Sequence, residues 1–300
     1  MSFNDIEPIF HNYFSTMENN SSQREAESVR LDTVKSLCQR SDLEKLPQEL
    51  IYQITGYLNL TDFLQFIQTS KSLSKSSFAL RQLEDLFQNN SIFKKPELIR
   101  KYLKLIPFSF TIFHNVLIRS IERNHISIVE MLLSDSRVDP SASNNQAIRY
   151  AAHKGHLQVV KLLIADSRVD PSADNNDAIC YAAHKGHLQV VELLIADSRV
   201  DPSGDSNQAI RFAAQKGHLR VVELLIADSR VDPSDGNNQA IRSAAKNGHL
   251  RVVELLLSDS RVDPSADDNS AIGYAAENGH LQVVELLIAD SRVDPSADSN

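Results

Sequence analysis

The sequence predicts an all-α protein whose larger part is a solenoid of short repeats. A proline recurs every 31 residues, at Pro140, Pro171, Pro202, Pro233, Pro264 and Pro295. Between prolines lie two apolar stretches with helical spacing and one polar turn sequence. A fixed period of this length is typical of solenoids, in which each repeat buries its apolar faces against its neighbours.

Each repeat contains two predicted helices. Asn145 or Asn176 is positioned to cap a first helix. Its apolar stripe is Ala147, Ile148, Ala151 and Ala152. A glycine follows where a helix C-terminus favours positive φ, at Gly155, Gly186, Gly217, Gly248 and Gly279. The second helix, with Leu157, Val160, Leu163 and Ile164, is apolar on most sides and therefore needs cover from its partner and from adjacent repeats.

The polar run between repeats, SRVDPSADNN, consists mainly of residues that favour turns, and its recurring Asp is interpreted as a turn former. The segment AAHKGHLQVVKLL resembles the ankyrin repeat. The resemblance covers residues 110–300, about six repeats and a truncated seventh. It implies an α-solenoid with short hairpin loops that binds a protein substrate. Two features depart from the pattern: Gln146-Ala147-Ile148-Arg149 replaces TPLH, and the repeat is shorter than the usual length of about 33 residues.

Composition limits the classes of partner. A net charge of −8 does not favour nucleic acid. No apolar run reaches the roughly 18 residues of a membrane span, and the N-terminus MSFNDIEPIF has no signal-peptide pattern. We therefore expect a cytoplasmic protein, with the nucleus as an alternative, that contacts no membrane. The two cysteines, Cys38 and Cys180, are expected to be reduced.

Residues 1–40 combine an aromatic cluster with a polar linker and predict a flexible segment. The cluster is either a short helix folded back on the body or a partner-docking peptide. Residues 42–88 predict three helices, the first of which has Pro47 in its first turn and Leu50, Ile54, Tyr57 and Leu58 as its stripe. Residues 89–109 predict a linker helix, from about Pro96 to Leu105, that caps the array.

The second region carries its own resemblance, to the F-box. The residues that carry it are Leu46, Pro47, Glu49, Leu50, Ile51, Ile54, Tyr57, Leu58, Asp62, Leu64 and Lys71. Phe63, Ser70 and Leu73 depart from the pattern. The resemblance implies docking onto the Skp-family adaptor of an SCF cullin-RING ubiquitin ligase, with Pro47, Leu50, Ile54, Leu58 and Leu64 facing that adaptor. The alternative is an ordinary helical cap for the solenoid.

No chemistry is predicted for the repeats. A histidine recurs before every second helix, as expected of a residue that closes the interhelical turn. His153 and His184 create HKGH twice, but no cysteine or carboxylate completes a metal set. Phosphate loops, nucleophile elbows and paired catalytic carboxylates are missing from the sequence as well. We therefore expect no catalysis, metal or cofactor.

Partner-binding residues are sought where the repeats differ. These positions lie at the exposed end of each first helix, at Tyr150, His153, Lys154, Tyr181, His184, Lys185, Phe212, Gln215, Lys216 and Lys246. The row is basic and is edged by the loop acids Asp174, Asp205, Asp235 and Asp267. We predict that it binds an acidic or mixed-charge peptide surface; the alternative is a solvated face.

Together these patterns predict a substrate receptor of an SCF-type ligase, which acts by holding a substrate near the conjugating enzyme. A scaffold or competitor without a ligase, and a chain that sequesters the adaptor, are the alternatives. The last helix pair is expected to present an apolar face. That face predicts a fragment of a longer array, a fraying end, or cover by a partner or second copy.

Overall fold

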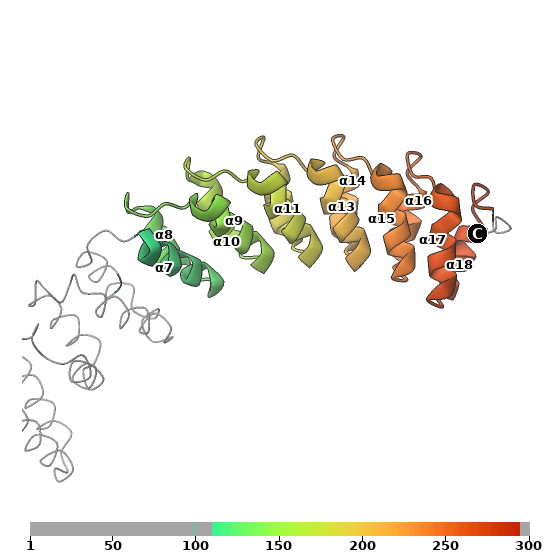
Figure 1. The fold of residues 1–300 in the computed structure, drawn as a ribbon, viewed down its shortest axis with the longest axis horizontal. Helices are drawn as coiled ribbons and strands as arrows, with labels where there is room; N and C mark the ends of the chain where they lie inside the picture. Colours follow the sequence, from blue (N-terminus) through green and yellow to red (C-terminus); the bar gives the residue numbers. More distant parts are fainter. Residues whose placement is uncertain (1–98, 100–109, 295–300) are drawn as a thin grey trace, which may run out of the picture. The chain divides into compact units, whose positions relative to one another are not determined.

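The computed structural model describes Ile99 and residues 110–294, and in these residues it contains helices and no strands (Figure 1). The helices are α7 (Phe110–Glu122), α8 (Ile126–Leu133), α9 (Ala142–Lys154), α10 (Leu157–Ala165), α11 (Ala173–Lys185), α12 (Leu188–Ile195), α13 (Gly204–Lys216), α14 (Leu219–Ile226), α15 (Asp235–Lys246), α16 (Leu250–Leu257), α17 (Ala266–Glu277) and α18 (Leu281–Ile288). The predictions for residues 1–40, 42–88 and 89–109 lie outside the described residues, apart from Ile99, which is helical and buried.

The helices form antiparallel pairs that follow one another in a single row, as Figure 1 shows. In each pair the odd-numbered helix comes first in the chain and the even-numbered helix second. First helices contact the next first helix more extensively than second helices contact the next second helix. Alanines at the contacts explain this, because small side chains let helices approach closely. The predicted all-α solenoid is therefore confirmed for this part of the chain.

The core is a repeated apolar layer rather than one central cluster. In the second repeat Ile148, Ala152, Val160 and Leu163 have no exposed surface, and their equivalents in the next three repeats are buried in the same way. Each layer contains side chains from both helices of a pair and from the neighbouring pair. Burial in one repeat therefore depends on the repeat beside it.

From α9 and α10 onward, the turn inside each pair contains the predicted left-handed glycine; between α7 and α8 the left-handed residue is Asn124, with φ 56°. Gly155 ends α9 with φ 73° and ψ 24°, and its N–H donates to the carbonyl of Ala152. A Cβ at this position would also lie 2.5 Å from Nδ1 of His187 in the next repeat. Glycine is therefore needed both for its backbone conformation and for the close approach of the neighbouring ring.

The recurring histidine links repeats, which the turn-closing interpretation did not anticipate. His187 Nε2 donates to the carbonyl oxygen of His153 at 3.1 Å, across the junction between repeats. Equivalent bonds of 3.0–3.4 Å join His156, His218, His249 and His280 to the preceding first helix. The ring forms no side-chain cap on its own helix.

The predicted capping role of Asn145 and Asn176 is wrong. Asn145 has φ 56° and follows two further left-handed residues, so the chain makes a left-handed turn before α9 becomes regular. Its side-chain oxygen accepts a hydrogen bond from the backbone N–H of Asp170 at 2.9 Å, and Asn176 accepts from Asp201 in the same way. Asn tolerates the left-handed region better than most residues, and here its amide joins two loops.

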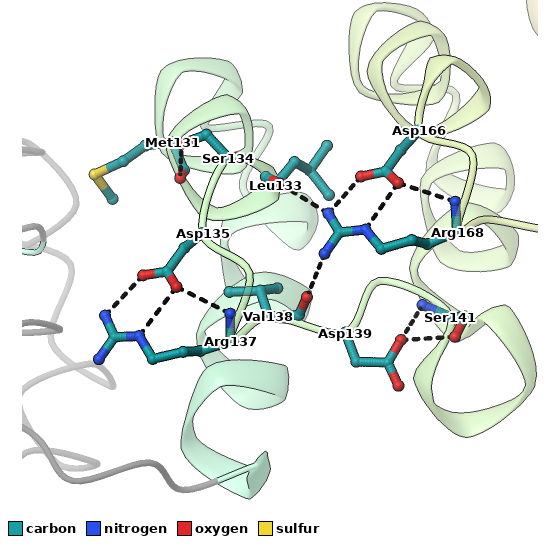
Figure 2. A network of polar contacts seen from close by, with 10 residues as sticks. All are labelled: Met131, Leu133, Ser134, Asp135, Arg137, Val138, Asp139, Ser141, Asp166 and Arg168. Atoms are coloured by element: carbon teal, nitrogen blue, oxygen red, sulfur yellow. Dashed lines mark hydrogen bonds and ion pairs between the residues drawn. The ribbon is translucent and has the colours of Figure 1, made fainter.

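From the second repeat onward, an Asp–Arg pair joins each loop to the repeat before it (Figure 2). Arg168 makes a two-pronged contact with Asp166, at 2.9 and 2.6 Å, and donates to the carbonyls of Val138 and Leu133, both at 2.8 Å. The later pairs repeat this arrangement. We call each such pair a staple. The Asp of VDP has the predicted turn role, since Asp139 accepts from both N–H and hydroxyl of Ser141.

The face of α17 and α18 that points away from α15 and α16 is apolar and exposed, as predicted. Leu281 is 66% exposed and Ile288 is 52% exposed. Ala276 is exposed although Ala152, its equivalent, is fully buried.

Candidate partner-binding surface

The predicted binding residues lie along the ends of successive first helices. We call the surface they share the first-helix face; it comprises Tyr150, His153 and Lys154 of α9 and their equivalents on α11, α13 and α15. The lysines at 154, 185, 216 and 246 are exposed, each as the last residue of its helix. Cations are favoured at helix C-termini by the helix dipole, so this position is a natural one for lysine.

Aromatic side chains connect neighbouring helices on this face. The rings of His153 and Tyr181 meet edge-on with centroids 5.7 Å apart, and those of His184 and Phe212 with centroids 5.3 Å apart. Gln215 replaces the histidine in the fourth repeat, where this pairing of rings ends. These two ring pairs form an aromatic layer between α9 and α13, which we call the floor of the first-helix face.

Two lysines lie over rings of the same surface. Lys154 Nζ is 5.4 Å from the centroid of Tyr150, within one helix, and Lys246 Nζ is 5.1 Å from that of Tyr274 on the next first helix. Such cation–π contacts hold the ammonium groups near the surface while leaving them hydrated. The structure thus brings two of the predicted lysines, Lys154 and Lys246, against aromatic rings.

The two histidines of the floor have lowered pKa values. Partial burial is the main cause for His153, and the charges of Lys185 and Lys154 add to it. For His184 burial again comes first, followed by Lys216 and Lys185. At neutral pH these rings are therefore largely uncharged, and the positive charge of the face resides on the lysines.

The acids that edge this face are mostly engaged by neighbours. Arg149 forms an ion pair with Asp174 and a second, at 2.8 Å, with Asp177. Asp267 pairs with Arg242, and Asp235 accepts from the amide of Asn207. No ion pair in residues 110–294 involves the four lysines of the face. The loop acids do not neutralise them, so their charge is available to a partner.

Sequence reasoning missed the arginines that hold this surface in place. The staples are formed by the Asp and Arg of a DSR sequence that occurs at six positions, and that repetition was the available signal. Arg149, Arg211 and Arg242 each bridge to the following repeat, through Asp174, Gln239 and Asp267 respectively. They share one repeat position, which is Cys180 in the third repeat and Gly273 in the sixth, and this was visible in the sequence, but their partners were not.

The described residues show little that could support bond-making chemistry. In them no three His, Cys, Asp or Glu residues gather as a metal site. Burial raises the pKa of the Cys180 thiol to about 12, so it is a poor nucleophile. The two histidines of HKGH have separate partners, because His153 contacts Tyr181 while His156 donates to Glu122. Over the same residues, no helix is long and apolar enough to cross a membrane.

The fold of the described residues defines the class of the protein as a solenoid of helix pairs, in which each repeat packs against the next. The chain belongs to the ankyrin-repeat family. The family model for ankyrin repeats in three copies matches residues 117–205, 148–237 and 210–299. Ankyrin repeats are protein-binding modules, and the family comparison contains no F-box match.

Among solved structures, the crystal structure of EF0377, an ankyrin repeat protein, is similar to this chain. The identity is 24% and the TM-score is 0.49, over 58% of this chain and 96% of that one. No curated protein sequence matches the chain.

Proposed function

We propose that this protein is a non-catalytic interaction scaffold that binds an acidic protein segment on its first-helix face. The observation that carries the proposal is the set of four exposed lysines, at positions 154, 185, 216 and 246, beside a floor of paired rings. Unneutralised charge and aromatic surface together suit a partner that offers both carboxylates and apolar side chains. The exposed ring of Tyr181 and the half-buried rings beside it supply contact area, while the lysines give orientation and speed of association.

The test is a charge reversal with a matched control. Lys154→Glu, Lys185→Glu and Lys216→Glu together remove the positive charge of the first-helix face. The control combines Lys161→Glu, Arg220→Glu and Arg251→Glu on the second helices, where all three residues are exposed, and it has the same net charge. Proteins captured by the wild type and by the control, but lost from the first-helix variant, are the expected result. Equal capture by the wild type, the first-helix variant and the control would contradict the proposal.

A second role rests on the sequence resemblance alone. The F-box pattern from Leu46 to Lys71 supports docking to a Skp-family adaptor and cullin, which would make the scaffold a ligase substrate receptor. These residues lie outside the described part of the structure. The test is a pull-down with purified adaptor and cullin. Binding by the wild type and its loss in Pro47→Ala, Leu50→Ala would establish the role, and no binding by either would leave the scaffold function by itself.

A further inference from the structure

The spacing of the lysines on the first-helix face restricts the conformation of a ligand, in addition to the charge that they supply. Lys154, Lys185 and Lys216 occupy the same position, the last residue of α9, α11 and α13. These helices pack side by side in the array. Neighbouring helices in contact are about 8–10 Å apart. The three ammonium groups therefore recur at a roughly constant interval along a line that crosses the helices.

Only some backbone conformations place carboxylates at that interval. A polyproline II segment rises about 3.1 Å per residue with three residues per turn, so every third side chain lies on one side at about 9 Å intervals. A β-strand places same-side residues about 7 Å apart, which does not match. An α-helix would need an acid every seventh residue to advance about 10 Å on one face.

The floor between the lysines favours the extended segment. The edge-on pairs His153–Tyr181 and His184–Phe212 fill the space between one first helix and the next. A polyproline II chain sets a short side chain or a proline ring against each such pair between successive acids. Flat aromatic surfaces bind proline-rich extended segments well because such segments lose little conformational entropy on binding.

From this match we infer that the first-helix face recognises an extended, polyproline II segment with an acidic residue at every third position. Each acid faces one of Lys154, Lys185 and Lys216, and the residues between them contact the paired rings. This row of lysines ends toward α17, because Asn247 and Asn278 replace the lysine at the same repeat position and Glu277 is acidic. This inference rests on the proposed function and adds the register and conformation of the ligand.

The test uses three synthetic peptides, of which the first two have equal composition, with three glutamates among prolines and alanines. In one peptide the glutamates are at positions i, i+3 and i+6; in a second they are consecutive. A third, longer peptide is helical, with glutamates at i, i+7 and i+14. Affinity is measured by calorimetry or fluorescence anisotropy at low and moderate salt, with the wild-type chain, the first-helix variant and the second-helix control described above.

We expect the period-three peptide to bind about tenfold tighter than the consecutive one, since three exposed ion pairs in register are individually weak but additive. Its affinity should fall with salt and be lost in the first-helix variant only. Equal affinities that are still lost in that variant would overturn the spacing and leave the proposed function standing. Tighter binding of the helical peptide would overturn the extended geometry. Binding of none of the peptides would overturn both.

Discussion

The second and sixth repeats have nearly the same sequence and very different surroundings. A Cβ added to Gly155 in the second repeat would lie 2.5 Å from the His187 ring of the next repeat, whereas a Cβ added to Gly279 in the sixth would have no atom within 4 Å. Ala152 is fully buried and Ala276 is exposed. The difference shows that the energetics of a repeat reside largely in its junctions, because identical residues are buried only where another repeat covers them.

The largest expected effect is a gradient of local stability along the chain. Amides in α11–α14 should exchange with deuterium about a hundredfold more slowly than those in α17 and α18, because the last pair opens without breaking a second junction. Hydrogen exchange followed by mass spectrometry measures this directly on the 300-residue protein. Equal protection across 173–226 and 270–290 would show that the exposed face is covered in solution.

Next in size is a pair of glycine substitutions. Gly186→Ala adds a Cβ 2.6 Å from Nδ1 of His218 at φ 74°, while Gly279→Ala adds one at φ 73° in open space. Both incur about 1–2 kcal/mol for a left-handed alanine, and the first should lose about 1–3 kcal/mol more because the histidine must move. Chemical denaturation of the two variants measures the difference. Losses of equal size would mean that the histidine contact contributes nothing to the junction.

The glycine case also shows what the sequence could predict. Helix pairs and left-handed glycines follow from local periodicity and backbone preference, and both are present in the described repeats. Asn145 was misassigned because capping is a local rule, whereas its amide bonds to Asp170, which is 25 residues away. Contacts of this kind depend on how one loop lies against the next, which no local pattern records.

The candidate surface, too, could be predicted from the sequence only in part. Its positions could be found by asking where the repeats differ, and the structure places those residues on one face. The edge-on contact of His153 with Tyr181 could not be predicted, since it depends on the offset between α9 and α11. The neutralisation of Asp174 by Arg149 was also missed, and it is what leaves the lysines as the unpaired charge of the face.

A staple should contribute less than the glycine contact but more than a surface ion pair. Arg199→Ala removes hydrogen bonds to the carbonyls of Val169 and Ile164 and leaves Asp197 without its guanidinium. We expect a loss of about 1–2 kcal/mol. The control, Arg220→Ala, breaks only a pair with Glu223 in which the Arg220 side chain is 77% exposed, and it should change stability by less than about 0.5 kcal/mol. The unfolding midpoints in urea distinguish the two, and a comparable shift in both variants would contradict the staple's role.

The smallest expected effect is the pH dependence of a single staple. It should be the same for the staple of Asp197, in the middle of the array, and for the staple of Asp290, in the last repeat. Hydrogen bonds from Arg199 and Arg292 lower the pKa values of Asp197 and Asp290 below the ordinary value. The unfolded chain therefore binds these protons more readily than the folded one. The stabilisation is complete above the unfolded pKa of about 4 and is lost as the pH falls through the lower folded pKa.

Thermal unfolding midpoints should accordingly change little from these two groups between pH 7 and pH 5 and fall below pH 4. Asp197→Asn and Asp290→Asn should each flatten that acid limb slightly and to a similar degree. The reason is that both staples reach back to a preceding repeat, Arg199 to Val169 and Arg292 to Val262, with carbonyl contacts of 2.9 and 2.8 Å. A flatter limb for the middle variant alone would indicate that the last repeat is already detached from its neighbour before the carboxylates are protonated.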